Sequence, residues 1–263
     1  MSGWTQAETL ARGAGEILGE YFGRIHRTDA QRKKGVRRDL VSEADIAAEK
    51  YLLEHIPDED DVLGEEGSER ATGAARQWIV DPLDGTVNFL HGIPFWAVSV
   101  ALVEHGKLAA GCVHAPALDL TFCAAAGEGT HVNGARAEVS ITESIDESIL
   151  ATGFAYRRNE LADNNFDNFE QLGMRAAGMR RMGAAAVDLA FLATGRLDGF
   201  WEPHLSAWDV AAGILLIREA GGRVTDFRGS EELEKLLFGR NLVASNGHIH
   251  DALRGALRPL RGL

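Results

Sequence analysis

The sequence predicts a mixed α/β protein in two halves, because helix-like and strand-like patterns are arranged differently before and after about residue 150. Two helix patterns, at 4–22 and 42–55, come first. Strand-like runs rich in apolar and β-branched residues follow, at 78–81, 95–103, 108–114, 120–125 and 148–151. Helix patterns then alternate with short strands, at 165–176, 184–194, 206–220 and 247–257. We therefore expect a mainly antiparallel sheet in the first half and an α/β arrangement in the second.

Capping signals and the lack of linkers define the predicted elements further. The first helix pattern repeats its apolar residues every three to four positions. The second begins at Ser42, where Ser42-x-x-Asp45 fits a capping box, and it ends before Pro57. No repeat or Pro/Ser-rich linker interrupts the chain, so we expect two rigidly docked parts, residues 1–145 and residues 146–263.

The composition is that of an ordinary globular protein. Of 263 residues, 45% are hydrophobic and 25% are charged, which argues against disorder. The formal net charge of -12 repels nucleic acid and anionic membranes, and the basic run at 32–38 is expected to be a solvated loop. The sequence shows neither a membrane span nor a signal peptide. We therefore expect a cytoplasmic protein that binds neither nucleic acid nor a membrane.

Neither the cysteines nor the histidines form a disulfide or metal-binding pattern. Cys112 and Cys123 are too few for a disulfide framework and are expected to be reduced core residues. They flank the turn signal at 115–119, so they can approach each other across a hairpin. The histidines are scattered, and we assign four of them to turns or helix surfaces: His91, His204, His248 and His250.

Acidic side chains stand in three separate segments that are typical of strand ends and helix starts. They are Gly64-Glu65-Glu66, Asp81-Pro82-Leu83-Asp84-Gly85-Thr86 and Ser206-Ala207-Trp208-Asp209. In the middle segment an apolar strand leads to Asp81, Pro82 fixes the backbone, and Asp84-Gly85 turns the chain. Backbone N–H groups at such a turn favour an anion, whereas the carboxylates favour a divalent cation. A phosphate bound through metal ions satisfies both preferences.

Each acidic segment also has a structural explanation when it is taken alone. Asp-Pro and Asp-Gly are common turn dipeptides. Both Ser206-x-x-Asp209 and Ser42-x-x-Asp45 fit capping boxes, in which the carboxylate only satisfies backbone N–H groups. If the segments converge, however, two carboxylates about 4 Å apart repel by about 4 kcal/mol at an effective dielectric constant of about 20. Divalent cations would relieve this repulsion, and all-oxygen ligands favour Mg²⁺ or Mn²⁺ over zinc.

Other hydrolase chemistries fit the sequence less well. Phosphatases that form a phosphoaspartate carry Asp-x-Asp-Gly-Thr, but here Pro82 stands two residues before Asp84. The chain has no Gly-x-Ser-x-Gly elbow, no P-loop and no dinucleotide-binding fingerprint. Direct attack by a metal-activated water on a phosphate monoester is therefore the favoured mechanism.

Longer runs surround the acidic segments. Besides Gly64-Glu65-Glu66 they are Trp78-Ile79-Val80-Asp81-Pro82-Leu83-Asp84-Gly85-Thr86-Val87-Asn88-Phe89, His91-Gly92-Ile93-Pro94, Ala97-Val98-Ser99, Trp208-Asp209-Val210-Ala211-Ala212-Gly213 and Glu219-Ala220-Gly221-Gly222. With these runs the chain resembles the inositol monophosphatase family of metal-dependent, lithium-sensitive phosphatases, especially its bacterial branch. The resemblance covers nearly the whole chain. It implies a five-layered α/β/α/β/α sandwich and a homodimer.

The resemblance implies metal ligands from both halves of the chain. Glu65, Asp81 and the Leu83 carbonyl group would bind a first metal ion. Asp81 would bridge to a second metal ion, which Asp84 and Asp209 also bind, and Glu65 would help to bind a weaker third one. The site would thus hold two or three Mg²⁺ ions, with Mn²⁺ as a substitute. The first half supplies most of these ligands, and the second half supplies Asp209.

The remaining matches concern the attacking water and the substrate. Glu65, Asp81 and Thr86 form the implied catalytic set, in which Thr86 and Glu65 orient the water. The implied substrate contacts are Asp84, Gly85, Thr86, Gly183, Ala184, Ala185, Glu202 and Asp209. Lys34 and Asp45 match polar residues at the edge of the site. Ala184 departs from the family pattern, which often has Thr there, so a hydroxyl group beside the sugar or inositol ring is lost.

The predicted reaction is in-line hydrolysis of a phosphate monoester, and the resemblance favours inositol 1-phosphate as the substrate. Fructose 1,6-bisphosphate, NADP(H), histidinol phosphate and 3′-phosphoadenosine nucleotides are alternatives, because related proteins act on them. Asn88-Phe89 after the turn favours the inositol branch over the nucleotide branch. A regulatory binding module with a structural Mg²⁺ ion is the alternative from a different class.

Overall fold

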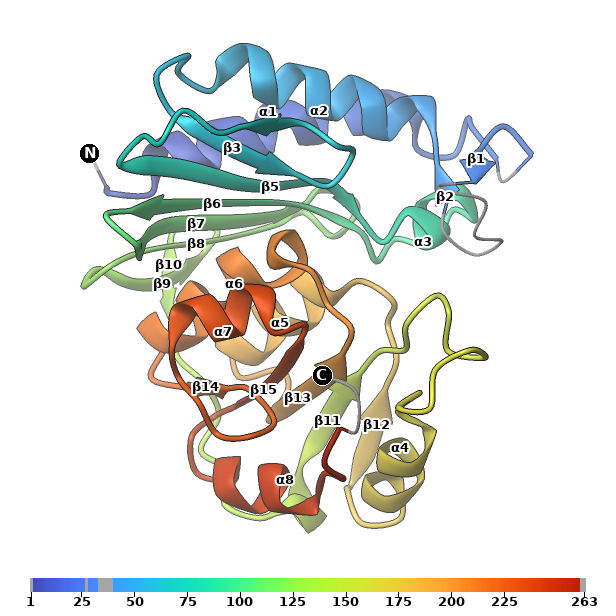
Figure 1. Cartoon of the computed structure of the whole chain (residues 1–263). Helices are drawn as coiled ribbons and strands as arrows, with labels where there is room; N and C mark the ends of the chain where they lie inside the picture. The colour runs from blue at the N-terminus through green and yellow to red at the C-terminus, as the bar shows by residue number, and fades with distance from the viewer. Residues whose placement is uncertain (1, 27, 33–39, 261–263) are drawn as a thin grey trace.

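The computed structural model describes residues 2–26, 28–32 and 40–260, which form a layered structure (Figure 1). Its helices are α1 (Thr5–Tyr21), α2 (Glu43–His55), α3 (Thr86–Leu90), α4 (Phe166–Gly173), α5 (Ala185–Ala193), α6 (Ala207–Glu219), α7 (Leu233–Phe238) and α8 (His250–Ala256). The five layers are, in order, α1 with α2, a large sheet, α5 with α6 and α7, a second sheet, and α4 with α8. This arrangement confirms the expected sandwich. None of the described helices is both long and apolar enough to cross a membrane.

The large sheet is built from the first half of the chain. Among the described residues it has eight strands in the order β10-β9-β8-β7-β6-β5-β3-β4. They are β3 (Asp61–Gly64), β4 (Glu69–Arg70), β5 (Arg76–Asp84), β6 (Ala97–Glu104), β7 (Lys107–Ala115), β8 (Leu120–Ala125), β9 (Gly129–Val132) and β10 (Ala135–Ala137). Only the β3–β5 pair is parallel in this sheet, so the prediction of a mainly antiparallel first half is confirmed. A separate short hairpin pairs β1 (Gln31–Arg32) with β2 (Leu40–Val41).

The second sheet is mixed and comes from the second half of the chain. Its strand order is β12-β11-β13-β15-β14. The strands are β11 (Ile149–Thr152), β12 (Gly178–Arg180), β13 (Gly199–Pro203), β14 (Arg223–Thr225) and β15 (Asn241–Ser245). β11 is parallel to β12 and β13, whereas β15 is antiparallel to β13 and β14.

Helix α6 is apolar on nearly all sides because a sheet lies on each side of it. Its residues from Val210 to Ile217 are all buried, as a helix between two layers requires. On the large sheet, a Cβ atom at Gly111 of β7 would lie only 3.2 Å from the Ala212 Cα of α6. Helices of the second half therefore pack directly on the sheet of the first half. The exact boundary at residues 145–146 stays a prediction.

The outer helices follow the predicted patterns. Helix α1 buries one face, which consists of Ala7, Leu10, Ala11, Ala14, Gly15 and Leu18. Helix α2 begins after Ser42, whose backbone N–H donates to Asp45 Oδ2 at 2.8 Å, so the predicted capping box is present. The thiol groups of Cys112 and Cys123 face each other across β7 and β8, with their Sγ atoms 3.1 Å apart. Both residues are buried in the core, as expected.

The surface assignment of one histidine is wrong. His250 is fully buried at the start of α8, and its ring nitrogens lie 3.0 Å from Thr225 Oγ1 and from Ser245 Oγ. Burial lowers the pKa of His250 to about 4, so the ring is neutral near pH 7. Its hydroxyl partners lie on two strands of the second sheet, β14 and β15, so the burial of this ring depends on the pairing of the strands rather than on a local sequence pattern.

Candidate active site

A β-bulge turns two aspartates of β5 toward the same side. Asp81 pairs with Ser99 of β6, whereas Asp84 pairs with Ala97, so β5 carries one extra residue between the two pairs. Pro82 lies in this bulge, where a ladder hydrogen bond is not required. In a regular strand, side chains three residues apart face opposite sides of the sheet. The bulge therefore allows both carboxylates to enter one site.

Glu65 is placed beside Asp81 by the parallel pairing of β3 with β5. Gly64 pairs with Val80, so the next residue of each strand follows at the same edge of the sheet. The two side chains are close enough to interact by a hydrogen bond. The register of β3 and β5 thus brings Gly64-Glu65-Glu66 next to the segment that contains Asp81.

Asp209 reaches the site from the start of α6 and also caps that helix. The Ser206 backbone N–H donates to Asp209 Oδ2 at 2.6 Å, so the structural role considered for this residue is real. The Ser99 hydroxyl group donates to the Trp208 carbonyl oxygen at 3.2 Å, which fixes the start of α6 against β6. Capping and metal binding are compatible, because a carboxylate has two oxygen atoms.

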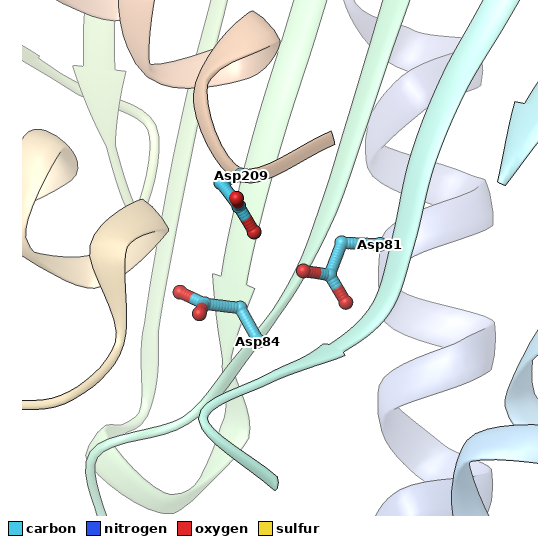
Figure 2. A group of neighbouring side chains, drawn as sticks. All are labelled: Asp81, Asp84 and Asp209. Atoms are coloured by element: carbon cyan, nitrogen blue, oxygen red, sulfur yellow. The ribbon is translucent and has the colours of Figure 1, made fainter. Parts of the chain in front are cut away.

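The three aspartates converge on a single point (Figure 2). Asp81, Asp84 and Asp209 each offer one carboxylate oxygen, and these atoms lie within 4.8 Å of one another. Each carboxylate is also held by a backbone N–H group, from Leu83 to Asp81 (2.9 Å), from Ala186 to Asp84 (2.7 Å) and from Ser206 to Asp209 (2.6 Å). The predicted convergence of these acidic segments is therefore present.

Burial and mutual repulsion make these carboxyl groups unusually hard to ionise. Burial raises the pKa of Asp84 to about 7, even though the N–H group of Ala186 acts in the opposite direction. Burial is also the largest cause of the raised pKa of Asp81 and of Asp209, followed in each case by the negative charge of Glu65. Such a cluster needs bound protons or a cation to be stable near pH 7. Its all-oxygen donor set fits divalent ions such as Mg²⁺.

Thr86 and Asp45 meet at the edge of this cluster. The Thr86 hydroxyl group lies 3.1 Å from Asp45 Oδ1 and 3.1 Å from the Leu83 carbonyl oxygen. Asp45 Oδ2 meanwhile accepts the Ser42 N–H of the capping box. Asp45 therefore serves both as a cap of α2 and as a partner of Thr86. Lys34, the other residue predicted at the edge of the site, lies outside the described residues.

The loop before α5 closes over the turn that follows Asp84. Gly85 has φ of 91°, and a Cβ atom there would lie 2.8 Å from the Phe95 carbonyl oxygen and 3.2 Å from Ala184 Cβ. The Asn88 amide group donates to the Phe95 carbonyl oxygen (2.7 Å) and to the Met182 carbonyl oxygen (2.8 Å). The segment 183–185 is thus held directly against the predicted phosphate turn.

Glu202 lies on β13 within electrostatic range of the aspartate cluster. Burial raises its pKa to about 8, with the positive charge of Arg181 opposing the shift and the negative charge of Asp84 adding to it. Its carboxylate covers the backbone at Gly153, where a Cβ atom would lie 2.1 Å from Glu202 Oε2. The predicted substrate residues therefore border the aspartate cluster on the side of α5 and β13.

Three further residues shape the site, and of these only Asn88 was named from the sequence, with no such role. Glu49 of α2 accepts the Glu66 N–H at 3.2 Å and so supports the loop that carries Glu65. Asn88 links the phosphate turn to the loop before α5, as described above. Asp188 is the only charged residue in the sequence of α5, AAVDLAFLA, and that isolation within an apolar helix was the available signal. The role of Glu49 left no comparable pattern.

Comparison with known proteins places the whole chain in one family. A model of the inositol monophosphatase family matches residues 2–260. A protein of Pseudomonas aeruginosa named Nus factor SuhB is 41% identical over 258 residues, which are 95% of this chain and 93% of that protein. An inositol-1-monophosphatase of Rhizobium meliloti is 41% identical over 252 residues, with 94% and 93% covered. The structure of an inositol monophosphatase from Anabaena (Nostoc) has a TM-score of 0.85 at 37% identity, with 98% and 96% covered.

These matches extend over both sheets and over all three acidic segments, so they concern the fold and the site together. The structure with 37% identity matches 98% of this chain, so the similarity includes the five-layered arrangement described above. The chain belongs to the inositol monophosphatase family, whose members are metal-dependent phosphatases.

Proposed function

We propose that this protein hydrolyses a phosphate monoester with Mg²⁺ as its cofactor and inositol 1-phosphate as its first substrate candidate. The observation that carries the proposal is the convergence of Asp81, Asp84 and Asp209 within 4.8 Å, in a buried setting that raises their pKa values. Apart from the capping role of Asp209, gathering these carboxylates in a buried setting is unfavourable for the fold alone, because their charges are poorly solvated and repel one another. Family membership supports the same conclusion.

The proposed metal ligands are Glu65, Asp81, the Leu83 carbonyl group, Asp84 and Asp209. Divalent ions bound there would lower the pKa of water and neutralise the charge on the phosphoryl oxygen atoms. The protein's own contribution is to fix the carboxylates, and the N–H groups of Leu83, Ala186 and Ser206 do so. Two or three ions are proposed, with Mn²⁺ as a substitute.

Thr86 and Glu65 are the residues proposed to orient the attacking water. The Thr86 hydroxyl proton has two acceptors, Asp45 Oδ1 and the Leu83 carbonyl oxygen, each 3.1 Å away. A lone pair of Thr86 Oγ1 would therefore accept a hydrogen bond from the water, and the Glu65 carboxylate would accept another. The backbone N–H groups of Gly85 and Thr86 would bind phosphoryl oxygen atoms, so the phosphorus stays in line with the water.

The leaving group would lie beside segment 183–185 and Glu202. Inositol 1-phosphate is favoured because a relative with 41% identity carries that activity in its name. The test is phosphate release from inositol 1-phosphate, fructose 1,6-bisphosphate, NADP, histidinol phosphate and 3′-phosphoadenosine 5′-phosphate, with Mg²⁺ and with a chelator. We expect Mg²⁺-dependent release with the largest kcat/KM for inositol 1-phosphate. Release that persists in chelator would refute the metal site, and a wide preference for another ester would reassign the substrate.

A regulatory role is the second candidate, because another relative with 41% identity is named a Nus factor. A purely structural metal site would be closed by protein ligands, whereas a catalytic one leaves positions for water and phosphate. Calorimetric titration with inorganic phosphate distinguishes the two. We expect phosphate to bind only when Mg²⁺ is present. Absence of phosphate binding in Mg²⁺-loaded protein would favour the regulatory candidate.

We also propose that the protein is a cytoplasmic homodimer. The cytoplasmic location is proposed because the sequence has only two cysteines, which are too few for a disulfide framework. The dimer is supported by family resemblance. Light scattering on the purified chain tests it, and a mass near 28.4 kDa would indicate a monomer instead.

A further inference from the structure

Asn88 of α3 holds three segments of the site together. Its side-chain Nδ2 atom donates to the Phe95 carbonyl oxygen at 2.7 Å and to the Met182 carbonyl oxygen at 2.8 Å. Its backbone carbonyl oxygen accepts the Ile93 N–H at 2.9 Å. Asn88 stands two residues after Thr86 and is buried. It therefore connects the helix after the phosphate turn both to the loop that follows this helix and to the loop before α5.

The amide group of Asn88 is matched to its two partners. A carbonyl oxygen accepts hydrogen bonds and cannot donate, so both N–H bonds of this amide group serve as donors. An ionised aspartate has nearly the same shape but no donor. At this position one of its oxygen atoms would face two carbonyl oxygens instead. Exchanging the amide nitrogen for oxygen thus turns two attractive contacts into two repulsive ones.

The loop before α5 belongs to the second half of the chain but rests on the first half. Gly183 has φ of 89°, and a Cβ atom there would lie 3.2 Å from Asn88 Nδ2, so the backbone approaches the amide group closely. The Ala186 N–H donates to Asp84 Oδ2 at 2.7 Å. Together with the hydrogen bond from Asn88, these contacts fix segment 182–186 against the turn that follows Asp84.

Segment 182–186 contains three of the residues that are proposed to border the leaving group: Gly183, Ala184 and Ala185. None of the three has a polar side chain, so their contacts with a leaving group depend on where the backbone of the segment lies. A displacement of about 1 Å is enough to spoil such contacts. The anchor that holds this backbone therefore affects which leaving groups fit.

We propose that Asn88 is a positioning residue that determines leaving-group specificity by anchoring segment 182–186 to the phosphate turn. This inference rests on the proposed function. Asn88 needs no contact with the substrate, because it acts through the backbone of the segment that it binds. Binding of the phosphoryl group is separate, since the metal ions and the N–H groups of Gly85 and Thr86 are proposed to provide it.

The test compares Asn88→Asp with the wild type at saturating Mg²⁺. Steady-state kinetics gives kcat/KM for inositol 1-phosphate, and calorimetry gives the Kd of inorganic phosphate, which has no leaving group. We expect kcat/KM to fall by about tenfold or more, since two hydrogen bonds are lost, while the Kd of phosphate stays unchanged. Asn88→Ala, which removes the donors without adding a charge, should show the same pattern with a smaller loss. Equal losses for both ligands, or an unchanged kcat/KM, would overturn the specificity role.

Hydrogen exchange provides a second readout that needs no substrate. The backbone amides of segment 182–186 should exchange about tenfold faster in Asn88→Asp than in the wild type, because local opening of the segment becomes easier. Unchanged exchange in this segment would contradict the anchoring role. Absence of Mg²⁺-dependent release from any ester in the wild type would instead overturn the proposed function, and hydrogen exchange would still decide whether Asn88 is the anchor.

Asn246→Asp is the matched control. Asn246 is also buried, and its Nδ2 atom also donates twice, to Ser140 Oγ at 3.0 Å and to the Thr142 carbonyl oxygen at 2.8 Å. It follows the last residue of β15, whereas Glu202 pairs near the start of that strand. Asn246→Asp should therefore lower stability but leave kcat/KM, phosphate binding and the exchange of the loop before α5 unchanged. The same changes in both variants would show that loss of stability alone explains them.

Discussion

The Thr86 side chain is proposed to orient the attacking water by accepting a hydrogen bond from it. Its hydroxyl group lies 3.1 Å from both Asp45 Oδ1 and the Leu83 carbonyl oxygen, so its orientation is fixed before substrate arrives. Fixed orientation is valuable because a small misplacement of a reacting group lowers the rate strongly.

Thr86→Ala should therefore lower kcat by about a hundredfold with little change in KM. Thr86→Ser keeps the hydroxyl group and should retain most of the activity. Steady-state kinetics of phosphate release at saturating Mg²⁺ measures both. Thr194→Ala is the control, because Thr194 Oγ1 only bonds to the backbone of its own helix. An unchanged kcat in Thr86→Ala would remove Thr86 from the mechanism.

At the scale of elements, the turn from β5 into α3 holds the two aspartates and the phosphate-binding groups together. Gly85 makes this turn possible with φ of 91°, a region that L-residues rarely adopt. Nearby atoms leave no room for a side chain, since a Cβ atom would lie 2.8 Å from the Phe95 carbonyl oxygen.

Gly85→Ala should lower the free energy of unfolding by about 3 kcal/mol and remove most of the activity. Gly92 provides the matched comparison, because its φ is 70° but no atom lies within 4 Å of the added Cβ. Gly92→Ala should cost only the strain of a positive φ, about 1 kcal/mol. Urea unfolding measures the difference. Equal losses in the two variants would show that the contact with Phe95 is unimportant.

The sequence predicted the long elements well because their apolar patterns are repeated over several turns or strand pairs. Helices α1, α2, α5 and α6 and strands β5–β8 lie where the patterns indicated. Helices α3 and α7 were not predicted, since six residues or fewer do not complete two turns of a period. The bulge in β5 was also not predicted. Its existence depends on the register with β6, and register is set by long-range contacts.

The acidic segments of the candidate site could be predicted from the sequence. The residues that contact and support these segments could not. Asp81 and Asp84 stood out because they lie in turn dipeptides, and Asp209 because it lies in a helix-capping signal. Glu49 and Arg181 did not, because their contacts are made across elements and leave no local pattern. Distant partners of this kind require a three-dimensional structure.

At the scale of the whole molecule, the cluster of Asp81, Asp84 and Asp209 contains residues from both halves of the chain. It also makes the free energy of unfolding of the metal-free protein depend on pH. Asp84 has a pKa of about 7 in the folded chain and an ordinary value of 3.8. Its protonated form is thus favoured by folding, and the stability that it contributes is lost as the pH rises through about 7. Two buried histidines, His114 and His250, with pKa values of about 4, act oppositely below pH 6.5.

The effect of Asp84 is isolated by comparison with Asp84→Asn, which keeps both histidines. Between pH 8 and pH 6 in chelator, the unfolding free energy of the wild type should rise by about 1 kcal/mol more than that of the variant. Urea unfolding at the two pH values measures this difference. Parallel pH dependences in the two proteins would show that Asp84 ionises normally in the folded chain.

The most direct test of the central claim is phosphate release by the wild type and by Asp209→Asn over a range of Mg²⁺ concentrations. Asp209 comes from the second half of the chain, so it tests whether both halves build one metal site. Asp226→Asn is the control, because Asp226 is buried but bonds only within its own loop. We expect Mg²⁺-dependent release in the wild type and in the control, and a loss of about a thousandfold or more in folded Asp209→Asn. Release by Asp209→Asn at the wild-type rate and Mg²⁺ dependence would contradict it.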